Sequence, residues 1–237
     1  MLAPIALAGA LVLGLTGFGS ALVTVPLASH FLPLPFVLAV FAVADLTSVV
    51  RLGLQRPQEV VWPEWLRMAP MIVLGIALGS TLLLNLPRTA GTLALGGFVV
   101  LYSVYSLMRR GPPGRVARGW SYAAGLAGGL SGSLFGAGGP PYAIYLASRG
   151  LDHTAFRATL AAVSIVSIGT RLLAYLVAGL LAQDGLWYAI AAAVPGALLG
   201  LTLASRVSPR ISRTALARAV ALTLLASGLS LLVRALR

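Results

Sequence analysis

Apolar segments of nearly constant length recur along this chain and determine the class of protein to which it can belong. They lie at 36–54, 65–84, 89–107, 158–180, 186–204 and 215–233. A helix of about 20 apolar residues crosses the roughly 30 Å hydrocarbon core of a bilayer. The residues are 59% hydrophobic and only 9% charged, whereas a soluble domain has about a quarter charged residues. The chain is therefore predicted to be an all-α integral membrane protein.

A glycine-rich interruption of the apolar sequence occurs twice. The first reads Gly-Phe-Gly-Ser-Ala from Gly17, the second reads Gly-Ala-Gly-Gly-Pro from Gly136, and each is followed at the same spacing by Leu-Ala-Ser. Backbone that leaves a helix inside a bilayer is tolerated only where it is buried in protein or lines a cavity. Two such breaks at matching places therefore indicate a transport site.

Further matches occur in the same order in the two halves of the chain. They pair Thr47-Ser-Val-Val-Arg51 with Ser167-Ile-Gly-Thr-Arg171, Gly75 and Gly79 with Gly196 and Gly200, and Arg88-Thr-Ala90 with Arg213-Thr-Ala215. The sequence is interpreted as a tandem duplication of residues 1–108 and 120–237, joined by a cytoplasmic linker at 109–119.

The arginines predict how each half enters the membrane. If 120–148 enters and leaves on one side as a re-entrant hairpin, the arginines outside the apolar segments gather on that side, except Arg88, Arg234 and Arg237. Such a bias is typical of the cytoplasmic side. With 2–30 as the matching re-entrant segment, each half is a hairpin plus three transmembrane helices, so the second half is predicted to be inverted relative to the first. Parallel repeats are the alternative, because they would place the arginines that follow the last apolar segment of each half on the same side of the membrane.

The residues around the two interruptions resemble a known family. Gly-Leu-Thr-Gly-Phe-Gly-Ser-Ala with Pro26-Leu in the first half, and Gly-Ala-Gly-Gly-Pro-Pro-Tyr-Ala-Ile-Tyr-Leu in the second, resemble the TauE/SafE family of sulfite exporters over nearly the whole chain. Ser20 and Ala21 stand where the family commonly has glycine. The resemblance implies export or uptake of sulfite, sulfonates or related small anions, without identifying the anion.

The interruptions themselves favour an anionic substrate. A half-helix that begins inside the membrane presents unpaired N–H groups and the positive end of its dipole. The substrate-binding residues predicted at the first break are Thr16, Gly17, Gly19 and Ser20, and those at the second are Gly136, Gly138 and Gly139. In an inverted repeat the two N-termini face each other near the midplane. The alternative is that these glycines only permit close helix packing, as expected for Gly75, Gly79, Gly196 and Gly200 within the chain or in a homodimer.

Two arginines within the apolar segments form a second candidate group. Thr47 precedes Arg51 by one helical turn, and Ser167 precedes Arg171 in the same way, so each pair shares a helix face. A guanidinium donates in a planar fork that fits the oxygens of sulfite or a sulfonate. A charge inside the membrane is a functional candidate, and all four residues are therefore predicted to bind substrate. For Arg51 the alternative is a side chain that reaches back to the interface.

Asp45 is the only acid well inside an apolar segment. It is a candidate for proton coupling, and a structural partner for an arginine or for freed backbone N–H groups is an equal alternative.

The remaining composition excludes several classes of protein. The chain has no Cys, only two His and five acids, and no His-Glu-x-x-His motif, so we expect no metal, no cofactor and no enzymatic activity. Its basic residues flank membrane segments, so nucleic-acid binding is not expected. The leading prediction is a multi-pass, alternating-access transporter of small anions in the plasma (inner) membrane, with lipid and the anion as its partners. A sulfonate or organic-anion uptake carrier and an anion channel are the alternatives.

Overall fold

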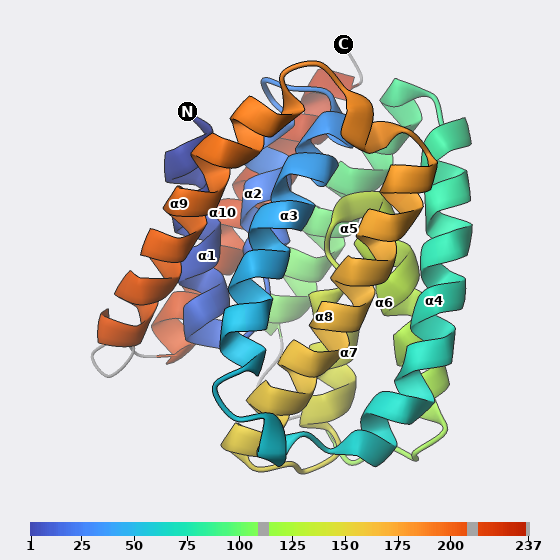
Figure 1. Ribbon diagram of the computed structural model, residues 1–237, viewed down its shortest axis with the longest axis vertical. Coiled ribbons are helices and arrows are strands. Elements are labelled where there is room, and N and C mark those ends of the chain that lie inside the picture. The colour runs from blue at the N-terminus through green and yellow to red at the C-terminus, as the bar shows by residue number, and fades with distance from the viewer. Residues whose placement is uncertain (109–113, 208–212, 236–237) are drawn as a thin grey trace.

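The protein is a bundle of helices, as the computed structural model shows for residues 1–108, 114–207 and 213–235 (Figure 1). The described residues contain no strand. The helices are α1 (Leu2–Thr16), α2 (Ser20–Ala28), α3 (Leu34–Gly53), α4 (Trp62–Asn85), α5 (Arg88–Met108), α6 (Trp120–Phe135), α7 (Gly139–Ala147), α8 (His153–Val177), α9 (Leu186–Val207) and α10 (Arg213–Ala235), with short 3₁₀ turns at Pro57–Glu59 and Leu180–Ala182.

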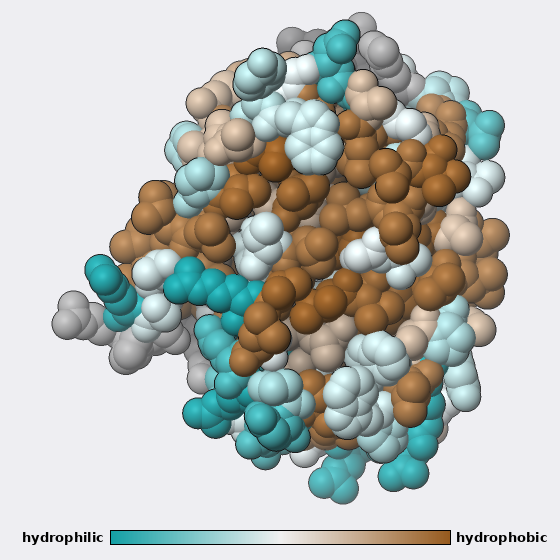
Figure 2. Space-filling view, viewed as in Figure 1, coloured by the Kyte–Doolittle hydropathy of each residue, from teal (hydrophilic) through white to brown (hydrophobic). Residues whose placement is uncertain are grey.

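The helices have the lengths and polarity that a bilayer requires. Among the described residues, α3, α4, α5, α8 and α9 are long and apolar enough to cross a membrane. In the space-filling view an apolar band crosses the molecule and hydrophilic residues gather below and above it (Figure 2). The prediction of an all-α, multi-pass membrane protein is confirmed. The predicted linker begins with residues 109–113, which lie outside the described residues.

Each glycine-rich interruption folds the chain back on itself. Gly17 ends α1 and Gly136 ends α6, both with a left-handed backbone at φ 89° and 73°, a conformation that glycine adopts without steric cost. α2 then lies against α1, and α7 lies against α6. The result is two helical hairpins.

The hairpins are held by small residues on the long helices. α1 packs along α9, and α6 packs along α4. Gly196 and Gly200 lie against the α1 backbone, and Gly75 and Gly79 lie against the α6 backbone, where a Cβ at Gly79 would be 2.8 Å from the Leu130 carbonyl oxygen. Small residues permit such close helix contacts in membranes. These glycines therefore serve packing within the chain and are not available for contacts between subunits.

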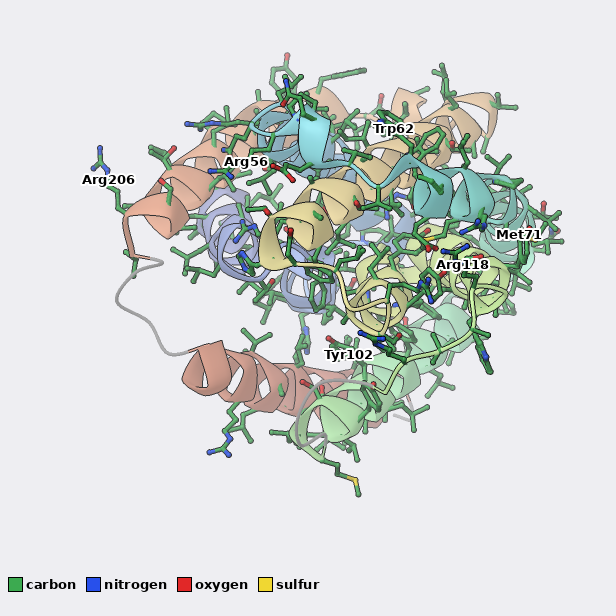
Figure 3. The ribbon with its side chains drawn as sticks, turned by 90° about the horizontal axis from the view of Figure 1, so that it is seen from below. Arg56, Trp62, Met71, Tyr102, Arg118 and Arg206 are labelled. Carbon is green, nitrogen blue, oxygen red and sulfur yellow. The ribbon has the colours of Figure 1, made fainter. Side chains whose placement is uncertain are left out.

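Two further helix pairs complete the bundle. α3 is deeply buried and packs on α8 and α9, and it runs in the direction opposite to α8 (Figure 1). α5 and α10 pack mainly on each other, for example where Gly96 approaches Leu232. In the view from below, this pair forms a layer beside the other helices (Figure 3).

The loops at one end of the molecule are joined by a buried acid. Glu64, in the first turn of α4, is 4% exposed. Its carboxylate accepts hydrogen bonds from Tyr145 Oη (2.5 Å) and Arg149 Nε (3.1 Å). Arg149 Nη1 also donates to the Val116 carbonyl oxygen (2.9 Å). The start of α4, the end of α7 and the segment before α6 therefore meet at one end, which is the end viewed in Figure 3 with Arg56 and Arg118.

α8 begins earlier than its apolar residues suggest. The predicted segment starts at residue 158, whereas the helix starts at His153. Asp152 is the cause, because its carboxylate accepts hydrogen bonds from Ala155 N (2.7 Å) and Thr154 Oγ1 (2.9 Å) and caps the helix. These bonds also lower the pKa of the Asp152 carboxyl below its ordinary value.

Candidate functional site

The two glycine-rich breaks meet in the interior of the molecule. A Cβ added at Gly139 would lie 2.9 Å from Phe18 Cβ, and one added at Gly136 would lie 3.1 Å from Ala21 Cβ. Segments separated by about half the chain are therefore in direct contact. The N-termini of α2 and α7 lie together as a consequence.

A small cavity of about 40 Å³, which we call the site cavity, lies where the breaks meet. One water needs about 10–15 Å³ of such space, so the site cavity has room for a ligand of only a few heavy atoms. Most of the substrate and coupling residues predicted from the sequence line it. These are Gly19, Ser20, Asp45, Gly136, Gly138, Gly139, Ser167 and Arg171.

The other predicted residues do not line the site cavity. Thr16 Oγ1 accepts a hydrogen bond from Phe18 N (3.3 Å) and so stabilises the backbone of the first break. Neither Thr16 nor Gly17 is a lining residue of the site cavity. Thr47 Oγ1 donates back to the Ala44 carbonyl oxygen (2.8 Å).

Arg51 lies away from the site cavity although it matches Arg171 in the sequence. It is exposed, and its Nη1 donates to Thr202 Oγ1 (3.1 Å). The physical reason is depth: α3 ends at Gly53, two residues after Arg51, whereas α8 continues from Arg171 to Val177. The structure thus separates two residues that the sequence treats as equivalent, and only Arg171 reaches the cavity.

Arg171 is held in place and still has donor capacity. Its side chain is 3% exposed, and Nη1 donates to the Gly132 carbonyl oxygen in the last turn of α6 (2.7 Å). Nε is buried and has no hydrogen-bond partner among the described residues. The guanidinium carbon also lies 6.0 Å from the centre of the Tyr175 ring, within the range of a cation–π contact. The guanidinium is therefore fixed in orientation, with N–H groups left for a ligand.

Asp45 brings the opposite charge to the same cavity. It is 6% exposed, and its carboxylate lies next to the Ser20 hydroxyl at the start of α2. Within the described chain it forms no ion pair with Arg171, although both line the site cavity. The Arg171 guanidinium and the Asp45 carboxylate thus line the same cavity without forming a direct ion pair in the described chain.

Tyr142 is a lining residue that was not predicted from the sequence. It is 1% exposed, and its hydroxyl lies 3.0 Å from Ser167 Oγ, in hydrogen-bond contact. Tyr142 is in the first turn of α7, directly after Pro140 and Pro141. The sequence signal that could have identified Tyr142 is its place as a polar side chain in the first turn of a half-helix.

Comparison with known proteins identifies the family of the chain. The family model described as sulfite exporter TauE/SafE matches residues 2–231. The chain belongs to the TauE/SafE family. The resemblance found in the glycine-rich motifs is thereby confirmed. No solved structure matches the chain.

A curated relative of this TauE/SafE protein comes from Comamonas testosteroni and is named a probable inner membrane transporter protein, TsaS. It is 28% identical over 177 residues, which cover 73% of each chain. The part of the chain that the structure describes holds no group of His, Asp and Glu side chains that could bind a metal ion.

Proposed function

We propose that this TauE/SafE protein is a secondary transporter of sulfite or a related small sulfur-containing or organic anion. The observation that carries the proposal is that both glycine breaks and a buried arginine line one cavity. The family description names sulfite export, and the relative's name places it in the inner membrane, which supports the same substrate class and location for this chain. Membership in a transporter family speaks against an enzymatic role.

The anion is held by three positive groups in this proposal. Ser20 at the start of α2 and Gly139 at the start of α7 line the cavity, and each helix N-terminus contributes about 0.3–1 kcal/mol towards a bound anion. At α7 the available N–H groups are those before Pro140, because Pro140 and Pro141 have none. Arg171 adds charge-assisted hydrogen bonds, worth about 1.5–3 kcal/mol each. Ser20, Ser167 and Tyr142 supply neutral hydroxyls at the rim of the same space. The cavity volume fits an ion as small as sulfite in the conformation shown.

We further propose that residues 1–108 and 120–237 are inverted repeats. The contact pattern supports this, because each hairpin packs on the other half: α1 on α9, and α6 on α4. The equivalent helices α3 and α8 pack on each other and run in opposite directions. The equivalent helices α5 and α10 also pack on each other. An axis in the membrane plane between α3 and α8 relates these pairs, as in other transporters with inverted repeats.

The proposed topology predicts which loops face the cytoplasm. The chain has no Cys, so single cysteines can be introduced one at a time. We expect Gly114→Cys and Asp152→Cys to react with an impermeant maleimide only from the cytoplasmic side, and Asp184→Cys only from the opposite side, because all three positions are exposed in loops. Labelling of Gly114→Cys and Asp152→Cys from opposite sides would contradict the α6–α7 hairpin.

Transport itself is tested in proteoliposomes. We expect labelled sulfite to enter against unlabelled internal sulfite with saturable counterflow, because a carrier with one cavity must exchange its cargo. Competition by sulfonates and carboxylates in the same assay ranks the substrate classes. Ohmic anion currents without counterflow would replace the carrier by a channel that uses the same residues.

A further inference from the structure

A second cavity adjoins the site cavity and has a different character. Its volume is about 440 Å³, and we call it the vestibule. It shares Phe18, Gly19 and Leu22 with the site cavity, and its walls come from α1, α2, α5, α7, α8 and α10. The two cavities are therefore neighbours separated by the first glycine break.

The vestibule extends to the arginine-rich end of the molecule. Ser106 lies in the last turn of α5, Ala147 ends α7 and Phe156 lies in the first turn of α8, and all three line the vestibule. These helix ends are at the end where Arg149 joins the start of α4 and the segment before α6. By the arginine bias this is the cytoplasmic end. A cavity of about 550 Å³ at the opposite end, around His30 and Pro87, shares no lining residue with the site cavity.

The outer wall of the vestibule is loosely attached to the rest of the protein. It is formed by α5 and α10, which pack mainly on each other. A further cavity of about 210 Å³ lies between α5 and α7 and shares Tyr102, Tyr105 and Ile144 with the vestibule. Tyr102 lies at this seam in the view from below (Figure 3). The seam is therefore a continuous region of low packing beside the first break.

Phe18 is the residue best placed to separate the two cavities. Gly19 has no side chain, and Leu22 is 2% exposed and fixed within α2. Phe18 instead stands in the break between Gly17 and Gly19, whose φ angles are 89° and 92°. Its N–H donates a hydrogen bond to Thr16 Oγ1, and its side chain is half-buried and lines both cavities.

We propose that Phe18 is the cytoplasmic gate of the anion site. The side chain lies beside Gly139 at the start of α7, and Phe18 lines both the site cavity and the vestibule. Rotation of the ring into the vestibule joins the two spaces and gives an anion a path along the seam between the α5–α10 pair and the hairpins. This inference rests on the proposed transport function, but access to the cavity can be measured without transport.

The gate is tested by the rate at which single cysteines react. Ser164→Cys reports on the site cavity and Ser106→Cys reports on the vestibule. In inside-out vesicles the probe is 2-sulfonatoethyl methanethiosulfonate, which is anionic and does not cross the bilayer. With Phe18→Ala, we expect Ser164→Cys to react about tenfold faster, the ratio for a barrier lowered by about 1.4 kcal/mol. The rate at Ser106→Cys stays unchanged.

Two further variants keep the test decisive. Phe18→Trp should slow the reaction of Ser164→Cys, and Phe156→Ala, which enlarges the vestibule at a residue that does not line the site cavity, should leave it unchanged. Equal rates in the Phe18→Ala, Phe18→Trp and Phe156→Ala backgrounds overturn the gate. If the rates differ as expected and sulfite counterflow is absent, the gate stands and the proposed cargo is wrong.

Discussion

Arg171→Gln is expected to weaken sulfite-dependent stabilisation of the purified protein and to slow sulfite counterflow. The substitution removes the only arginine that lines the site cavity among the described residues. Charge-assisted hydrogen bonds contribute about 1.5–3 kcal/mol, so the affinity should fall by about ten- to hundredfold. The measurement is the rise in melting temperature with added sulfite, because a ligand that binds only the folded state raises its stability.

Arg51→Gln is the matched control. Arg51 has the same position in its repeat, but it is exposed and bonded to Thr202, so we expect sulfite binding to be unchanged. Arg171→Lys keeps the charge and loses the planar fork, and its affinity should lie between wild type and Arg171→Gln. Arg171 also holds α6 through the Gly132 carbonyl oxygen. A purely structural role would lower the melting temperature without sulfite and leave the sulfite-induced rise intact, which would contradict our assignment.

The glycine breaks were predictable because their chemistry is local. A glycine in the left-handed conformation ends a helix whatever surrounds it, and Gly17 and Gly136 do so at the predicted places. The apolar segments are local signals too, and each corresponds to a long helix. The start of α8 differs from the predicted start of its apolar segment because Asp152 caps the helix and extends it beyond its apolar part.

The residues that line the site cavity were only partly predictable from the sequence. The depth of a residue in the bundle and the direction in which its helix face points both depend on tertiary packing. The pairing of Arg51 with Arg171 followed the repeat, yet the repeats place them at different distances from their helix ends. For Asp45 the sequence left proton coupling and a structural role as equal alternatives. The structure places Asp45 in the lining of the cavity beside Arg171.

Asp45→Asn is expected to remove the pH dependence of anion binding. The carboxylate of Asp45 lines the same small cavity as Arg171 without pairing with it in the described chain, so its negative charge opposes a bound anion. Protonation removes this charge, and proton binding and anion binding must then favour each other equally. Binding to the wild type should therefore weaken as the pH rises, while Asp45→Asn should bind at high pH as well as the wild type does at low pH.

Methanesulfonate is the suitable probe for this measurement, because its own charge does not change across the neutral range, whereas that of sulfite does. The methanesulfonate-induced rise in melting temperature is recorded against pH for the wild type, Asp45→Asn and the control Asp184→Asn, whose side chain is exposed and does not line the cavity. A pH dependence that persists in Asp45→Asn would assign Asp45 to structure, as the partner of the Ser20 hydroxyl at the start of α2. Its loss in Asp45→Asn alone would make this carboxylate the site where proton binding and anion binding are coupled.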